Sequence, residues 1–183
     1  MFWMYGGAFN PPTIAHENII KAILKLIKND KLVLVPVGNH YKKNGLVDIN
    51  HRIHMLSLLN LSIIIEDIER DMFKGSIHTL KALEVKYESP FGFIIGSDQL
   101  KDITSWIEYQ VLFAHHKVII VRRPHFDIHP YIAMLDKLKC QYQILELHYD
   151  ISSTEFRNKE KKPQDVVNKD VLEYIKLNHL YKE

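Results

Sequence analysis

Short apolar runs alternate along the chain with longer segments of helical periodicity. The apolar runs are rich in β-branched or aromatic residues, which favour strands, and they lie at residues 2–5, 32–37, 62–65, 91–95 and 117–121, with a weaker sixth near 142–147. Between them, apolar positions recur at helical spacing over residues 14–28, 51–60, 76–87, 107–115 and 131–139. Strands that alternate with crossover helices predict an α/β fold, with a parallel sheet of five or six strands and helices on both faces.

The end of the chain departs from this alternation. Residues 158–163 form a charged stretch, and a last helix is predicted over residues 169–177, with Val171, Leu172 and Ile175 on one face. We therefore expect residues 151–183 to be a small C-terminal helical part. Because neither a linker nor an internal repeat interrupts the sequence, residues 1–183 are expected to form one domain.

Glycines and charged or polar residues directly follow four of the predicted strands. They are Gly6-Gly7 after the first strand, residues 38–43 after the second, residues 96–98 after the fourth and Arg122-Arg123 after the fifth. Ligands of open parallel sheets bind at the carboxyl ends of the strands. The agreement between the pattern and the chemistry predicts a nucleotide site at this edge of the sheet.

The segment from Tyr5 to His16, YGGAFNPPTIAH, is the most specific in the chain. Gly6-Gly7 lets the backbone turn sharply and come close to a ligand, and Thr13 suits the N-cap of the following helix. The free N–H groups at the start of that helix would face a phosphate, with His16 beside it. The alternative is a tight turn and a capped helix in which His16 is a surface residue. The segment lacks the glycine pattern of dinucleotide-binding folds and the Walker loop.

Two further segments carry candidate phosphate ligands. In ISSTEFR, residues 151–157, hydroxyls at a helix start are followed by Arg157, and these groups would suit a polyphosphate. The alternative is a capping box made by Ser152 and Glu155, with Arg157 in solvent. Lys42 and Lys43 in the loop after the second strand would reach phosphates, although lysine pairs in loops are usually solvated.

A candidate site for ribose and for a flat heterocycle follows the fourth strand. A carboxylate such as Asp98, just past a buried strand, accepts ribose hydroxyls, and an indole such as Trp106 stacks on a planar ring. Taken alone, the same residues suit a helix cap and a packing position.

Composition excludes several classes of function. The 24 basic and 22 acidic side chains leave a net charge of +2, which is too balanced for bulk attraction to nucleic acid. Cys140 is the single cysteine, which rules out an intrachain disulfide and favours a reducing compartment. The start of the chain does not resemble a signal peptide, and no apolar run approaches the length of a membrane span. These features predict a cytoplasmic protein with no membrane or nucleic-acid partner.

Taken together, FNPPTxxH at residues 9–16 and ISSTxxR at residues 151–157 resemble motifs of the nucleotidylyltransferase superfamily. Within it, the chain is similar to nicotinamide or nicotinate mononucleotide adenylyltransferases. The likeness extends through PVGNHYKKNGL, GSDQL with a downstream tryptophan, and LEYIxxNHLY near the end, so it covers essentially the whole chain in order. It implies a Rossmann-like fold and a reaction in which ATP and a pyridine mononucleotide give a dinucleotide and pyrophosphate, in NAD biosynthesis. Mg²⁺ would be carried with ATP, without a protein metal site.

The resemblance also implies roles for individual residues. The catalytic residues would be His16, Lys43 and Arg157. ATP would be bound by Gly7, Ala8, Phe9, Asn10, Thr13, Lys42, Gly96, Asp98, Ser152, Ser153 and Thr154. The pyridine mononucleotide would be bound by Ser76, Thr79, Trp106 and Arg122.

Two departures from the family pattern leave the preferred pyridine open. Thr13 replaces the first histidine of the bacterial His-x-Gly-His motif, as in many eukaryotic-type nicotinamide mononucleotide enzymes, so a hydroxyl or backbone donor would serve there. Ser76 instead matches the small hydroxyl residue of bacterial nicotinate enzymes. Pantetheine-phosphate adenylyltransferases, cytidylyltransferases and non-catalytic nucleotide-binding regulators are the alternatives. Whether the chain forms a homo-oligomer is also open.

Overall fold

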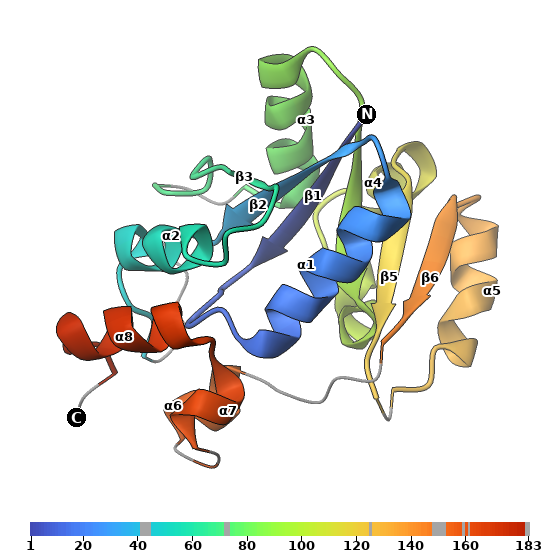
Figure 1. Ribbon diagram of the computed structural model, residues 1–183. Helices are drawn as coiled ribbons and strands as arrows, with labels where there is room; N and C mark the ends of the chain where they lie inside the picture. The colour runs from blue at the N-terminus through green and yellow to red at the C-terminus, as the bar shows by residue number, and fades with distance from the viewer. Residues whose placement is uncertain are drawn as a thin grey trace.

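A six-stranded parallel sheet forms the centre of the molecule (Figure 1). The computed structural model describes residues 1–40, 45–71, 74–124, 126–147, 153–158, 160 and 162–181. Every pairing in the sheet is parallel, and the order is β3-β2-β1-β4-β5-β6. The strands are β1 (Phe2–Gly7), β2 (Lys31–Pro36), β3 (Ile64–Ile65), β4 (Phe91–Gly96), β5 (Val118–Arg122) and β6 (Tyr142–Glu146). The predicted α/β fold class is confirmed.

Helices cover both faces of this sheet. They are α1 (Ile14–Ile27), α2 (Ile49–Ser57), α3 (Ser76–Tyr87), the 3-10 helix η1 (Ser97–Ser105), α4 (Tyr109–His115), α5 (His129–Lys137), α6 (Ser153–Arg157), α7 (Pro163–Val166) and α8 (Lys169–Leu177). Helices α1, α2, α7 and α8 share one apolar cluster, whereas α3, η1, α4 and α5 share the other.

Alternation along the strands divides the core between these two layers. In β1, Trp3 and Tyr5 point into the layer of α1, and Met4 points into the opposite layer. Successive side chains of a strand face opposite sides, so a strand that is buried on both faces reads as one apolar run. This accounts for the continuous hydrophobic segments in the sequence.

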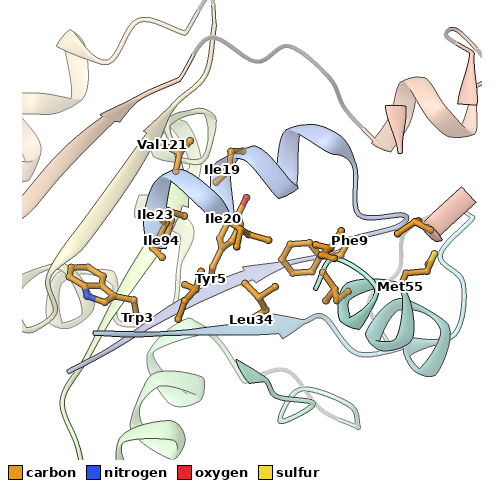
Figure 2. Close-up of a cluster of buried hydrophobic side chains, with 14 of the residues drawn as sticks. Trp3, Tyr5, Phe9, Ile19, Ile20, Ile23, Leu34, Met55, Ile94 and Val121 are labelled. Carbon is orange, nitrogen blue, oxygen red and sulfur yellow. The ribbon is translucent and has the colours of Figure 1, made fainter. Parts of the chain in front are cut away.

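Helix α1 packs across the centre of the sheet (Figure 2). Its residues Ile19, Ile20, Ile23 and Ile27 are buried, at the spacing that places them on one helical face. The buried stripe holds the amino end of α1 beside the carboxyl end of β1. The helix start predicted at Thr13 is thereby positioned at the edge of the sheet where ligands of this fold bind.

The chain reverses its direction of travel across the sheet between β1 and β4. From β1 it proceeds through β2 to β3 at one edge, and it then returns to β4 on the other side of β1. The connections that follow β1 and β4 therefore leave in opposite directions. Such a switch point opens a crevice at the carboxyl ends of the two strands.

Two elements differ from the sequence prediction. Residues 97–105 form η1, which was not expected because its polar composition carries no clear apolar period, although Leu100 and Ile103 are buried. Strand β3 has only two residues, shorter than the apolar run at 62–65. The predicted last helix is confirmed as α8, which lies beside α2 (Figure 1), with the ring of Tyr174 stacked on His54 at 4.3 Å.

Candidate active site

Two cavities open at the carboxyl ends of β1 and β4. The His16 cavity has a volume of about 410 Å³, and the Trp106 cavity has a volume of about 490 Å³. Both are lined by Gly6, Gly7 and Ala8 at the carboxyl end of β1, and by Gln99 of η1. The two cavities therefore meet at the carboxyl end of β1, at the switch point of the sheet. Gly6 and Gly7 are still paired with β2 there, so the sharp turn predicted at these glycines does not form.

The His16 cavity brings together most of the residues that were predicted to bind ATP. Those that line it are Gly7, Ala8, Phe9, His16, Gly96, Asp98, Ser153, Thr154 and Arg157. They come from β1, α1, β4, η1 and α6, which are far apart in the sequence but converge at one edge of the sheet. Lys42, Lys43 and Ser152 lie outside the described residues.

His16 is held by the start of its own helix. Thr13 is the N-cap of α1, and its backbone N–H donates to Nδ1 of His16 over 3.1 Å. The Thr13 hydroxyl lies 2.7 Å from the same nitrogen and accepts from the backbone N–H of His16 over 3.3 Å. Because Nδ1 accepts a hydrogen bond, the neutral imidazole carries its proton on Nε2. In this tautomer the Nε2–H group is the hydrogen-bond donor of the ring.

Thr13 itself is turned away from the cavity, which revises its predicted role. Its side chain is 1% exposed and does not line the His16 cavity. The hydroxyl and backbone donors that were expected to replace the first histidine of the motif act on His16 and not on a ligand. Thr13 is therefore a positioning residue.

Substitution Thr13→Val tests this role, because valine keeps the branched shape and removes the hydroxyl. We expect a loss of about 1 kcal/mol in the free energy of unfolding from the missing cap. We also expect kcat to fall roughly tenfold, since the His16 ring would lose part of its support. Urea unfolding and steady-state turnover measure the two effects. Thr13→Ser is the matched control, and wild-type kcat in the valine variant would contradict the assignment.

Arg157 is held against the turn that precedes α1. Its guanidinium donates to the carbonyl of Asn10 over 2.7 Å and to the Thr154 hydroxyl over 3.3 Å. Ser153 donates to the carbonyl of Pro11 over 2.8 Å. These bonds place α6 across the mouth of the His16 cavity from α1. The guanidinium is half-buried and keeps further N–H donors for an anion.

The side chain of Asn10 is fully buried and does not line either cavity, contrary to its predicted role as an ATP ligand. Its amide donates to the carbonyl of Gly45 over 2.7 Å. Its oxygen accepts from the backbone N–H of Val47 and from the hydroxyl of Tyr181, over 3.1 and 2.8 Å. Burial raises the pKa of this tyrosine. Asn10 thus ties the loop between β1 and α1 to the loop after β2 and to Tyr181.

Arg123, and not Arg122, lines the His16 cavity. The backbone N–H of Arg123 donates to Ser97, and its Nε lies 3.4 Å from a carboxylate oxygen of Asp98. A Cβ at Gly96 would approach that carboxylate too closely, so the Asp98 side chain would have to move from its present position. Arg122 lines neither the His16 cavity nor the Trp106 cavity and pairs with Glu146 over 2.9 Å, in a hollow that Arg123 also lines. The structure therefore does not bring Arg122 together with the other predicted pyridine ligands.

The Trp106 cavity has a mostly apolar wall. Ser76 and Trp106, two of the predicted pyridine ligands, lie in it together with Met4, Val37, Phe93 and Ile107. Thr79 does not line it, because its hydroxyl is buried and donates to Oε1 of Glu69 over 2.8 Å. Glu69 is part of the wall and was not predicted. Burial raises the pKa of its carboxyl group.

Comparison with known proteins agrees with this arrangement. The cytidylyltransferase-like family model matches residues 4–159. A probable nicotinate-nucleotide adenylyltransferase of Acholeplasma laidlawii is 36% identical over 188 residues, which cover all of this chain and 98% of the relative. The chain belongs to the nicotinate-nucleotide adenylyltransferase family. The resemblance noted in the sequence is thereby confirmed.

Other members of the nicotinate-nucleotide adenylyltransferase family agree over the same length. One from Fusobacterium nucleatum is 32% identical, and the match covers 97% of each chain. The solved structure of Plasmodium falciparum nicotinic acid mononucleotide adenylyltransferase complexed with NaAD superposes with a TM-score of 0.83 at 27% identity. That superposition covers 98% of this chain and 96% of the other.

In this family member, a buried arginine that was not among the predicted site residues holds the segments that follow β1 and β2. Arg52 of α2 is fully buried and donates to the carbonyls of Val47, Ala8 and Val37 over 2.9, 3.0 and 2.6 Å. Burial lowers the pKa of its guanidinium. Because its N–H groups satisfy carbonyls from three segments, Arg52 links the ends of β1 and β2 beside both cavities. Only the three-dimensional structure reveals this role.

Within the described part of this adenylyltransferase-family chain, no group of three or more His, Cys, Asp or Glu side chains is placed to hold a metal ion. Asp98 is the single carboxylate among the residues found in the wall of the His16 cavity. In the same described residues, no helix has the length and apolar character needed to cross a membrane.

Proposed function

We propose that this chain transfers the adenylyl group of ATP to nicotinate mononucleotide and forms NaAD and pyrophosphate. The observation that carries the proposal is the meeting of the His16 and Trp106 cavities at Gly6, Gly7 and Ala8, at the carboxyl end of β1. A polyphosphate in the first cavity and a mononucleotide in the second would bring their phosphates together there. The names of the relatives and the NaAD complex of the Plasmodium falciparum enzyme support the same reaction.

The reaction needs no nucleophilic side chain. An oxygen of the mononucleotide 5′-phosphate attacks the α-phosphorus of ATP and forms the new P–O bond. The bond from the α-phosphorus to the oxygen bridging to the β-phosphorus breaks, and that oxygen leaves with pyrophosphate. The protein therefore contributes position and charge stabilisation, as in related phosphoryl transfers.

The residues of the His16 cavity are suited to these tasks. We infer that Nε2 of His16 and the amino end of α1 bind the α- and β-phosphates, because both present N–H donors there. Thr154 and Arg157 bind the β- and γ-phosphates and the departing pyrophosphate. Asp98 binds a ribose hydroxyl. Lys43, assisted by Lys42, stays a predicted phosphate ligand.

Trp106 would stack on the pyridine ring in the second cavity. The amino end of α3 begins at Ser76, and Gly75 and Ser76 both line this cavity. Gly75 has a φ of 101°, a conformation that favours glycine. A helix amino end stabilises negative charge, so the nicotinate carboxylate suits this wall better than a neutral carboxamide.

Mg²⁺ would enter as part of the ATP substrate. Phosphate oxygens and water supply most ligands of such an ion, and a single nearby carboxylate such as Asp98 is compatible with that binding mode. A location in the cytoplasm and self-association stay predictions.

The deciding experiment measures pyrophosphate release with ATP and each candidate acceptor. We expect kcat/KM to be higher for nicotinate mononucleotide than for nicotinamide mononucleotide. Turnover of ATP with phosphopantetheine, or of CTP with the acceptor of a cytidylyltransferase, would contradict the proposal. Absence of turnover with every acceptor would instead favour a nucleotide-binding regulator.

A further inference from the structure

Glu69 is a buried carboxylate in the wall of the Trp106 cavity. The residue is 7% exposed, and its Oε1 accepts a hydrogen bond from the Thr79 hydroxyl. Among the residues that the structure describes, no lysine, arginine or histidine forms an ion pair with it. His40 acts on this carboxyl electrostatically and partly offsets the effect of burial on its pKa, without forming an ion pair with it. A buried charge without an ion-pair partner is costly, so its location in a cavity wall indicates a function.

Glu66, three residues earlier, provides an internal comparison. It is 8% exposed, almost as buried as Glu69. Its carboxylate is paired with the ammonium group of Lys86 at 2.7 Å and also accepts from the hydroxyl of Tyr87. The fold thus compensates one of these two buried acids and leaves the other facing a cavity. Hydrogen bonding to Thr79 does not require a charge, because the neutral oxygen of a glutamine would accept equally well.

The substrate proposed for this cavity carries the missing charge. In a pyridine mononucleotide the ring nitrogen is bonded to ribose and is therefore a pyridinium cation. We propose that the carboxylate of Glu69 is the counter-ion of this pyridinium ring and makes the Trp106 cavity selective for a positively charged ring. The inference rests on the proposed function, which places the mononucleotide in this cavity. Trp106 would add a cation–π contribution on the ring face.

This role predicts discrimination by ring charge. The reduced form of nicotinamide mononucleotide has nearly the same shape as the oxidised form, but its dihydropyridine ring is uncharged. A carboxylate in the wall favours the oxidised form, and it does so for nicotinate and nicotinamide rings alike, because both are pyridinium ions. The amino end of α3 recognises the charge of the ring substituent, whereas Glu69 recognises the positive charge of the ring itself.

The proposal is tested by calorimetric titration. Both forms of nicotinamide mononucleotide are titrated into the wild-type chain and into the Glu69→Gln variant. Glutamine keeps the acceptor for Thr79 and removes only the charge. We expect the wild type to bind the oxidised form roughly tenfold more tightly than the reduced form. The variant should lose most of this preference by weaker binding of the oxidised form, while its KM for ATP stays unchanged. Glu66→Gln is the matched control and should retain the preference.

Two results would overturn the proposal. One is equal binding of both forms by the wild-type chain, which needs no variant and does not depend on how Glu69→Gln folds. The other is a variant that binds both forms more weakly by the same factor, because Glu69 would then act only on the structure of the wall. Either result leaves the proposed reaction intact if wild-type turnover with nicotinate mononucleotide is observed. Failure of that turnover would refute the proposed function separately.

Discussion

Replacing His16 with alanine is expected to lower kcat by about 10²-fold or more, the usual scale for the loss of one donor that stabilises a transition state. The bond between Thr13 N–H and Nδ1 places the proton of the neutral ring on Nε2. His16 is also in the wall of the cavity where the phosphates would react. Its N–H would therefore stabilise charge that grows on the phosphate oxygens. Pyrophosphate release at saturating ATP and nicotinate mononucleotide measures the effect.

A second variant separates catalysis from helix capping, because His16 contributes to both. Glutamate at this third position of the helix is the residue usually found in a capping box. His16→Glu should therefore keep the thermal stability of the wild type, yet turn over as slowly as the alanine variant, since a carboxylate offers no N–H donor. A folded His16→Ala protein with turnover near the wild-type value would remove His16 from the catalytic residues.

Much of the fold follows from the hydrophobic pattern. All six strands form where apolar runs were found. Apart from the short β3 and the edge strand β6, they are buried on both faces, and such strands read as continuous apolar runs. The convergence of His16, Asp98 and Arg157 could also be expected, since the first two follow parallel strands and the third belongs to a recognised motif. The extent of η1 could not be predicted, because 3-10 segments lack the period of an α-helix.

The choice between Arg122 and Arg123 could have been predicted from strand alternation. In β5, Ile119 and Val121 face the layer of α1, and Ile120 faces the other layer. Continuing this alternation places Arg123 on the side of α1, where the His16 cavity lies. Arg122 then belongs to the other side, which excludes it from the His16 cavity. That side also holds the Trp106 cavity, but Arg122 pairs with Glu146 and does not line it.

Asn10 and Glu69 show what the sequence could not provide. Asn10 belongs to a nucleotide-binding motif, but its side chain points inward because the amide satisfies three buried or half-buried groups from distant segments. Glu69 lies in an irregular segment after β3, so no periodicity indicates which side of the chain it faces. Both roles depend on long-range contacts, which a local pattern does not encode.

Arg157 contributes a different kind of stabilisation from His16. Its guanidinium is oriented by the carbonyl of Asn10 and the hydroxyl of Thr154, so the planar group is already aligned when a polyphosphate enters. Helix α6, which carries it, is attached through Ser153 to the turn before α1. The side chain would therefore bind ATP before the reaction and stabilise pyrophosphate as it leaves.

For Arg157→Ala we expect KM for ATP to rise about tenfold and kcat to fall by a similar factor, because ground-state and transition-state contacts are lost together. Initial rates at varied ATP and saturating nicotinate mononucleotide separate the two parameters. Arg157→Lys keeps the charge but loses the planar fork, so its kcat/KM should lie between those of the wild type and the alanine variant. Arg70→Ala, which removes an exposed partner of Asp67, is the control for a general loss of positive charge. If KM and kcat were both unchanged in Arg157→Ala, α6 would have no part in ATP binding, and the phosphates would have to be held from the side of α1 alone.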